Sequence, residues 1–215
     1  MSEWPTNTDL SEALDAAGIP VPAAGVLTSA LALSVASFEG ATGWYPFAAA
    51  SGATAQESPI SIPSRSLVSV VSLGGGLLTS TAPTISLNDT DLVAADDYTL
   101  CPPDAPRKGQ PYTYIKLKYE KVCDKDTLTA SGIWGYCAHN AVPEMARAAV
   151  LAYAAMEIAA PSIQGGTAKR VLAQADEGDV RYQWGSSIEE RQAAVRSWQT
   201  NWDMAVSKFQ QRRVF

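Results

Sequence analysis

The spacing of the apolar residues changes twice along this chain, and that change restricts the fold more than any other feature. Apolar residues recur every three or four positions in residues 23–39, 143–160 and 187–209, as they do on one face of a helix. Residues 66–134 instead contain short runs of β-branched and aromatic side chains separated by turn residues, which is typical of strands. Because helices and strands do not alternate, the pattern excludes a parallel doubly wound sheet. We therefore predict an α+β fold, in which N- and C-terminal helices form a helical bundle with a β-rich insert between them.

The same pattern predicts how the chain is divided. Residues 1–47 supply the N-terminal helices, and residues 48–135 form the β-rich block, which begins with a long loop of Ala, Ser, Gly and Pro. Residues 136–215 form the C-terminal helices and a tail, and we expect them to pack with residues 1–47 as one domain. Within the β-rich block, residues 112–122 and 127–134 are separated by a four-residue turn and are predicted to form a hairpin.

Helix boundaries are clearest in the C-terminal part. Pro143 is expected at the first helical position, where its missing amide hydrogen is not needed, and Pro161 is expected to end this helix. Ser187 and Glu190 have the spacing of a capping box at the start of the last helix. The apolar residues of that helix share one face: Ile188, Val195, Trp198, Trp202, Ala205, Val206 and Phe209. This face predicts a helix that packs against the rest of the bundle.

The last residues of the sequence differ from the helix before them. Arg212 and Arg213 suit the negative end of the helix dipole, but Val214 and Phe215 gain nothing from exposure to water. One interpretation is a docking peptide, in which Phe209, Val214 and Phe215 contact a neighbouring subunit and the arginines pair with its carboxylates. The other is that the tail folds back onto its own domain.

Charge is distributed unevenly along the sequence. Residues 1–100 contain ten acidic side chains and one basic, Arg65, whereas residues 101–215 contain twelve acidic and fifteen basic side chains. The formal net charge of −6 argues against a large surface that binds nucleic-acid phosphates. A chain polarised in this way can present faces of different charge to different neighbours, which suits a component of an assembly.

No segment indicates export or insertion into a membrane. The sequence starts without a basic region followed by an apolar run, and its most apolar stretch, residues 21–38, is rich in Ala and interrupted by Ser and Thr. Cys101, Cys123 and Cys137 are an odd number of cysteines, which favours reduced thiols in a cytosolic compartment. We therefore expect no membrane partner.

Residues suited to catalysis or metal binding are few. His139 is the only histidine, and Cys137 two positions before it could lie on the same side of an extended chain, so a cysteine-dependent hydrolase or transferase stays an alternative. The three cysteines and this histidine could by number form a zinc site, but their spacings of 22, 14 and 2 residues lack the close pair that structural zinc sites use. Gly74–Gly76 is not followed by the Lys and Ser or Thr of a phosphate-binding loop. We expect no catalytic residue, no metal and no cofactor.

The second half of the sequence resembles a known family in the order of its short elements. These elements are Asp97-Tyr-Thr-Leu100, Pro111-Tyr112, Ala130-Ser-Gly-Ile-Trp-Gly-Tyr136, Val142-Pro143 at the start of an Ala-rich helix, and Gly178-Asp-Val-Arg-Tyr182 before the last helix. Over residues 97–215 their order and spacing resemble bacteriophage head-to-tail adaptor proteins, also called head completion or connector proteins. Those proteins often have a small residue-Gly-x-Trp-Gly element at the end of a hairpin.

The resemblance implies a structural, non-enzymatic component of the virion. Such adaptors form a homo-oligomeric ring, usually of twelve copies, that docks beneath the portal protein and offers its other face to tail or neck proteins. The genomic DNA passes through the lumen, and the ring lies in the neck after assembly in the host cytoplasm. A tail or capsid-decoration protein stays an alternative.

We expect structural roles for three residues, Trp134, Gly135 and Pro143. Trp134 is expected to be buried where the hairpin meets the helix that Pro143 begins. Gly135 is expected to supply a backbone angle that other residues resist.

Overall fold

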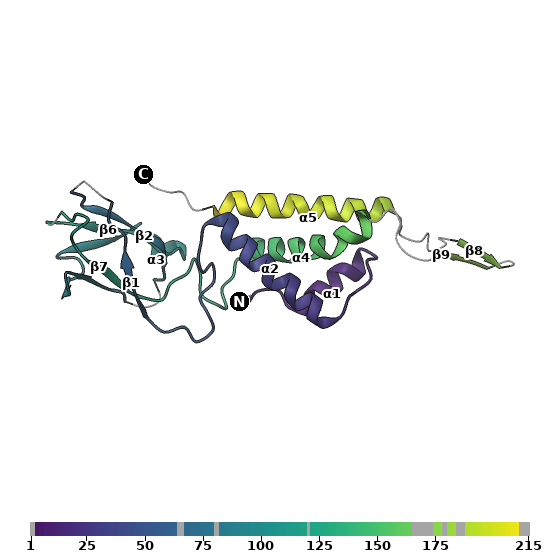
Figure 1. Cartoon of the computed structure of the whole chain (residues 1–215), viewed down its shortest axis with the longest axis horizontal. Coiled ribbons are helices and arrows are strands. Elements are labelled where there is room, and N and C mark those ends of the chain that lie inside the picture. Colours follow the sequence, from purple (N-terminus) through teal and green to yellow (C-terminus); the bar gives the residue numbers. More distant parts are fainter. Residues whose placement is uncertain are drawn as a thin grey trace. The chain divides into compact units, whose positions relative to one another are not determined.

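The computed structural model describes residues 3–63, 67–79, 82–119, 121–164, 174–177, 180–183 and 188–210, without the side chains of 161–164, 174–177, 180–183 and 188–189. The chain is divided into two compact units (Figure 1). A β-rich unit contains Gly43–Val142, and a helical unit combines Ser2–Thr42 with Pro143–Gln210. The units are divided after residues 42 and 142, whereas the sequence predicted divisions after residues 47 and 135. Helices from both ends of the chain flank a β-rich middle, which confirms the predicted α+β class.

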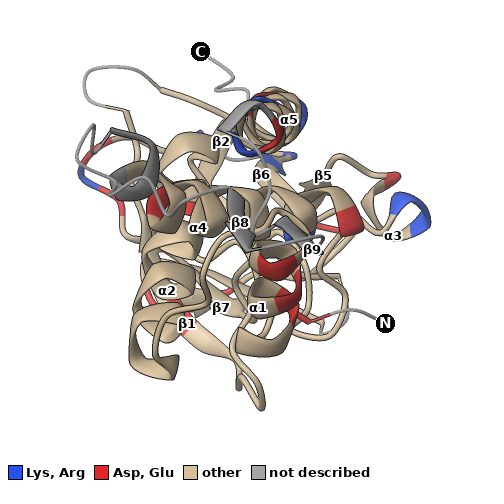
Figure 2. Cartoon of the chain, turned by 90° about the vertical axis from the view of Figure 1, so that its right-hand side faces the viewer, with Lys and Arg blue, Asp and Glu red and all other residues tan. Residues whose placement is uncertain are grey.

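The helical unit is arranged around α4, Glu144–Gln164. This helix contacts α1 (Asn7–Ala16), α2 (Ala24–Thr42) and α5 (Ile188–Phe209). It lies between α2 and α5 in two views at right angles (Figure 1) (Figure 2). A hairpin of β8 (Gln174–Glu177) and β9 (Val180–Gln183) belongs to the same unit.

The end of α4 differs from the prediction. Pro161 lies within the helix, which continues to Gln164, so the expectation that Pro161 ends it was wrong. A proline removes one backbone hydrogen bond from the preceding turn, but it does not forbid a short continuation.

The apolar faces of the helices meet in one core. Its buried residues are Leu10, Leu14, Ile19, Leu27, Ala30, Leu31, Ala154, Ala155 and Ala159. Phe38, fully buried in α2, is surrounded by the rings of Trp4, Trp202 and Phe209, with centroids 5.7 to 6.2 Å away. These edge-to-face contacts hold α5 against α2. Each described side chain on the predicted apolar face of α5 is buried or half-buried, which confirms that face.

The β-rich unit contains two antiparallel sheets, with strand orders β1-β7-β3-β4 and β2-β6-β5. The strands are β1 (Gln56–Ile60), β2 (Val70–Leu77), β3 (Thr84–Leu87), β4 (Thr90–Asp91), β5 (Tyr98–Cys101), β6 (Tyr112–Leu117) and β7 (Leu128–Gly132), and a short helix, α3 (Ala105–Lys108), precedes β6. Their inward side chains form a single core that includes Val71, Ile85 and Ile115, all fully buried.

The hairpin predicted between residues 112–122 and 127–134 was wrong. β6 pairs with β2 and β5, whereas β7 pairs with β1 and β3, so the two segments lie in different sheets. Both segments contain strands, as expected, but side-chain alternation identifies a strand without identifying its neighbour.

Among the described residues, α2 is long and apolar enough to cross a membrane by length and composition, with a mean hydropathy of 1.3. The Ser and Thr residues in this stretch therefore do not by themselves exclude a span. One face of α2 is buried in the helical core through Leu27, Leu31 and Phe38, as in the core helix of a folded bundle. The opposite face is exposed.

Candidate functional site

Trp134 packs against the core of the β-rich unit and is half-buried there. The indole Nε1 donates a hydrogen bond to the carbonyl oxygen of Gln56 at 3.1 Å. A Cβ added to Gly75 would lie 3.5 Å from the Trp134 Cε3, so the ring rests on that glycine. The contacts that hold the indole are therefore with strands, whereas the sequence predicted contacts with the helix that Pro143 begins.

Gly135 lies where backbone segments approach closely. The residue is buried and has a φ of +152°, which L-residues rarely adopt. Its N–H donates to the carbonyl oxygen of Gly76 at 2.8 Å. A Cβ added to Gly135 would lie 3.0 Å from the Ala49 nitrogen and 3.2 Å from the Cys137 carbonyl oxygen. Both the backbone angle and the lack of space therefore require glycine at this position.

The chain after this glycine is attached to Phe47. The N–H groups of Tyr136 and Cys137 donate to the Phe47 carbonyl oxygen at 2.8 and 3.1 Å. The rings of Phe47 and Tyr136 stack with centroids 4.8 Å apart, and Trp44 packs edge-on against Tyr136 at 5.2 Å. Burial raises the pKa of the Tyr136 hydroxyl above its ordinary value. Trp44 and Phe47, which are close together in the sequence, thus pack with Tyr136 and hold this end of the β-rich unit together.

The Cys137 thiol is not arranged as a nucleophile. It is buried, and its Sγ donates to the Phe47 carbonyl oxygen at 3.7 Å. Burial raises the pKa of this thiol to about 12, so it is neutral at pH 7. Reactive cysteines instead have a lowered pKa, which cations or helix N-termini provide. Within the described residues, no group of three or more His, Cys, Asp and Glu side chains is placed to hold a metal ion.

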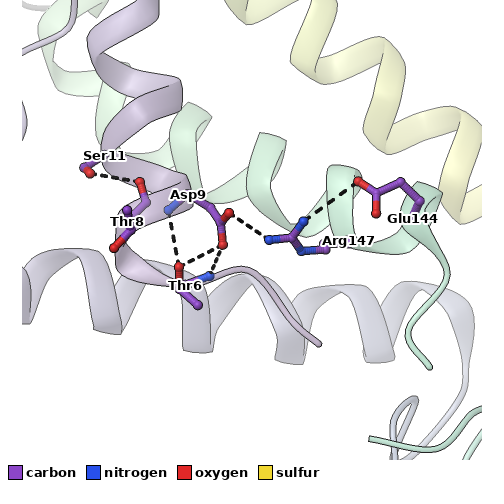
Figure 3. Close-up of polar contacts among 6 residues, drawn as sticks. All are labelled: Thr6, Thr8, Asp9, Ser11, Glu144 and Arg147. Carbon is purple, nitrogen blue, oxygen red and sulfur yellow. Dashed lines mark hydrogen bonds and ion pairs between the residues drawn. The ribbon is translucent and has the colours of Figure 1, made fainter. Parts of the chain in front are cut away.

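At the start of α4, an ion pair joins this helix to α1. Pro143 lies directly before α4, and its carbonyl oxygen accepts hydrogen bonds from the N–H groups of Ala146 and Arg147 at 2.9 and 3.0 Å. The Arg147 guanidinium lies 2.7 Å from the Asp9 carboxylate and 4.0 Å from that of Glu144 (Figure 3). The pair fixes the position of α1 on α4.

Asp9 is held from a second side by the residue that caps α1. The N–H and hydroxyl groups of Thr6 donate to the Asp9 carboxylate at 2.7 and 2.8 Å (Figure 3). These bonds and the nearby Arg147 guanidinium hold the pKa of the Asp9 carboxyl below its usual value. Sequence reasoning missed this ion pair because its two residues are far apart in the chain. The one available signal was that Arg147 is the single base of an Ala-rich helix.

Only one residue of the docking peptide predicted from the sequence lies in the described part of the chain. Phe209 is buried and packs edge-on against Phe38 at 6.2 Å. Its assignment to a partner surface is therefore corrected, because the ring already fills the core of the helical unit. Arg212, Arg213, Val214 and Phe215 lie outside the described residues.

No family model and no curated protein matches this sequence. Among similar solved structures, one is described as the neck of an empty GTA (gene transfer agent) particle computed with C6 symmetry, with a TM-score of 0.49, 14% identity, and coverage of 100% of this chain and 95% of that chain. Another is described as the neck of a native GTA particle computed with C12 symmetry, with a TM-score of 0.46, 15% identity, and coverage of 100% and 96%. Both descriptions name the neck of a particle. A likeness at these TM-scores and identities carries no conclusion about activity or partners.

Proposed function

We propose that this chain is a structural subunit of the neck of a phage-like particle: a head-to-tail adaptor that docks beneath the portal and joins it to the tail. In this role the chain binds protein neighbours and performs no chemical reaction. A tail or capsid-decoration protein would share the virion without contacting the portal, so location distinguishes the two. The cysteine-dependent enzyme is disfavoured by the buried, neutral thiol of Cys137.

The observation that carries the proposal is the place of the adaptor-like elements in the fold. Asp97–Leu100 leads into and through β5, Pro111–Tyr112 begins β6, and Val142–Pro143 begins α4. Ala130–Tyr136 runs from β7 to the backbone contacts of Gly135. There the fold leaves no room for a side chain larger than that of glycine. At Gly135 the backbone geometry, and not a chemical reaction, determines which residue is required. A structural subunit requires residues of this kind.

We further propose a closed ring, of twelve copies, around a channel for the genomic DNA. Residues 3–42 contain five acidic side chains and no basic one. A lumen lined by such a surface would let DNA slide, because phosphate contacts that arrest it would be missing. Tail or neck proteins would occupy the face opposite the portal.

The tail residues test the docking step. A chain shortened to end at Gln210 keeps Phe209 in the core, so we expect an unchanged thermal midpoint together with loss of attachment to portal-containing heads. Burying one Phe contributes about 2 kcal/mol, or roughly 30-fold in affinity for one tail, and twelve tails multiply that effect.

Two matched variants separate the chemistry of docking. The double variant Val214→Ser with Phe215→Ser removes the apolar groups and keeps the charges. The double variant Arg212→Gln with Arg213→Gln removes the charges and keeps the apolar groups. We expect each pair to weaken attachment to heads, measured by co-sedimentation. A shortened chain that attaches at the level of the full chain would overturn the docking role of the tail.

A further inference from the structure

β8 and β9 form a sheet of only two strands, which lies between α4 and α5 in the chain (Figure 1). Within the described residues, each of these strands pairs with the other alone, so each keeps one edge to which no strand is paired. No other described element packs closely against them. A two-stranded hairpin by itself is at best marginally stable in water. This hairpin therefore has two edges at which a further strand would stabilise it.

The two strands of this hairpin carry opposite charge. β8 contains Asp176 and Glu177 and no basic residue, whereas β9 contains Arg181 and no acidic residue. In the register of the hairpin, Asp176 is opposite Arg181, and Gln174 is opposite Gln183. Opposite charges at directly opposed positions stabilise an antiparallel pair of strands, and like charges destabilise it. The two edges of the hairpin are therefore complementary to each other.

The other edge strands of the described fold do not complement β8. The edges of the two larger sheets are β1, β4, β2 and β5, and none of these four strands contains a basic residue. β1 and β4 contain the acidic residues Glu57 and Asp91, which would suit β9. However, Pro59 lacks the N–H that pairing along β1 requires, and β4 is only two residues long. Among the described edge strands, β9 is thus the one whose charge suits β8.

We propose that β9 of one copy pairs antiparallel with β8 of the next copy, in the register of the hairpin itself. This register places Arg181 opposite Asp176 of the next copy. The contact joins two different edges, so it is heterologous and closes into a ring when the rotation between copies permits it. Each strand then has a neighbour on both sides. The inference rests on the ring of the proposed function and specifies the element that connects its copies.

The charges favour this contact over a symmetric dimer of two hairpins. Pairing of β8 with β8 would bring Asp176 and Glu177 of both copies together, and pairing of β9 with β9 would bring together two copies of Arg181. Both arrangements oppose like charges. Pairing of β9 with β8 is the arrangement that opposes unlike charges, and it leaves a free edge at each end to which the next copy can add.

Disulfide formation between two different variants tests the contact in the full chain. Cys123→Ser removes the half-exposed thiol, and Cys101 and Cys137 remain buried. In this background, one chain carries Gln183→Cys and the other carries Gln174→Cys. Mild oxidation of the mixture should give the mixed dimer, because the proposed register places these two positions opposite each other. Each variant oxidised alone should give far less dimer, since its own cysteines do not meet.

Two further mixtures complete this experiment. Tyr182→Cys with Ala175→Cys probes the adjacent row, because hydrogen-bonded and non-hydrogen-bonded rows alternate and the second kind brings side chains closer. The matched control is Gln183→Cys with Glu177→Cys, because position 177 lies three residues, or about 10 Å, further along β8. We expect mixed dimer from at least one opposed pair and only background from the control pair.

Exchanging the charges of the two strands provides the second readout. In the variant Asp176→Arg with Arg181→Asp, unlike charges remain opposed within the hairpin and between copies of the variant. Between a variant copy and a wild-type copy, however, the contact opposes like charges. We expect the variant to associate with itself as wild type does. It should associate with wild type about tenfold more weakly, because an attraction is replaced by a repulsion. Sedimentation of differently labelled chains measures both.

The results separate the hairpin contact from the ring itself. Mixed dimer from an opposed pair at several times the yield of the control pair supports the contact. Equal yields, no mixed dimer at any protein concentration, or free association of the exchanged variant with wild type overturns it. Rings that form without these crosslinks leave the proposed function in place and remove only the hairpin contact. A chain found outside the neck removes the proposed function, whatever the crosslinks show.

Discussion

Gly135→Ala is a substitution for which the structure predicts a large effect from a single methyl group, because backbone strain and close contact act together. A non-glycine residue held in a sparsely populated backbone region costs about 1–3 kcal/mol. The new Cβ would also lie 3.0 Å from the Ala49 nitrogen and 3.2 Å from the Cys137 carbonyl oxygen. These two atoms form a hydrogen bond of 2.9 Å, and separating them costs about 1 kcal/mol more. We therefore expect a loss of about 3 kcal/mol in the free energy of unfolding.

Gly52→Ala is the matched control. Gly52 also has a positive φ, +69°, but a Cβ added there meets nothing within 4 Å. Its cost should be limited to backbone strain, about 1 kcal/mol. Urea unfolding followed by tryptophan fluorescence gives both values, and hydrogen exchange at the Ala49 amide reports the local bond. If Gly135→Ala costs no more than Gly52→Ala and the Ala49 amide exchanges at its normal rate, the close approach at Gly135 is wrong.

Three further predictions concern single side chains. Trp134→Phe should lower the free energy of unfolding by about 1 kcal/mol, because the hydrogen bond to Gln56 is lost. Trp134→Ala should lower it by about 2 kcal/mol, because the ring is half-buried. Equal losses for the two variants in urea unfolding would contradict this. Asp9 has a lowered pKa, so its contribution is present above pH 4 and is lost as the pH falls through the folded-state value. The stability gap between wild type and Asp9→Asn, measured by thermal melts, should therefore narrow in acid, and a constant gap would refute the role of the carboxylate. Cys137 should resist a thiol reagent at pH 8 until urea unfolds the protein, since its pKa is about 12; rapid labelling of the native chain would contradict its burial.

Local features of the helices could be predicted from the sequence because they depend on nearby residues. The apolar face of α5 follows from spacing alone, and Trp202 and Phe209 lie on it as expected. Pro143 precedes α4 by one residue, within the usual variation of helix ends. Pro161 was misjudged because a proline removes one backbone hydrogen bond of the preceding turn but does not forbid a short continuation of the helix.

Contacts between distant segments could not be predicted in the same way. β7 lies between β1 and β3, which come much earlier in the chain, and nothing in the strand pattern of residues 127–134 identifies those neighbours. An apolar residue such as Phe209 is expected both in a core and at a partner surface, so the sequence alone does not distinguish the two places. In the structure, Phe209 packs against the ring of Phe38 in the core. The ion pair of Arg147 with Asp9 likewise depends on the packing of α1 against α4.

The neck role is tested most directly by a reconstruction of particles that contain this chain, calculated without imposed symmetry. We expect the chain to form a closed ring of twelve copies between the head and the tail, in contact with the portal. Density for this chain on the capsid shell, along the tail tube, or in any arrangement that does not close into a ring would contradict the proposal.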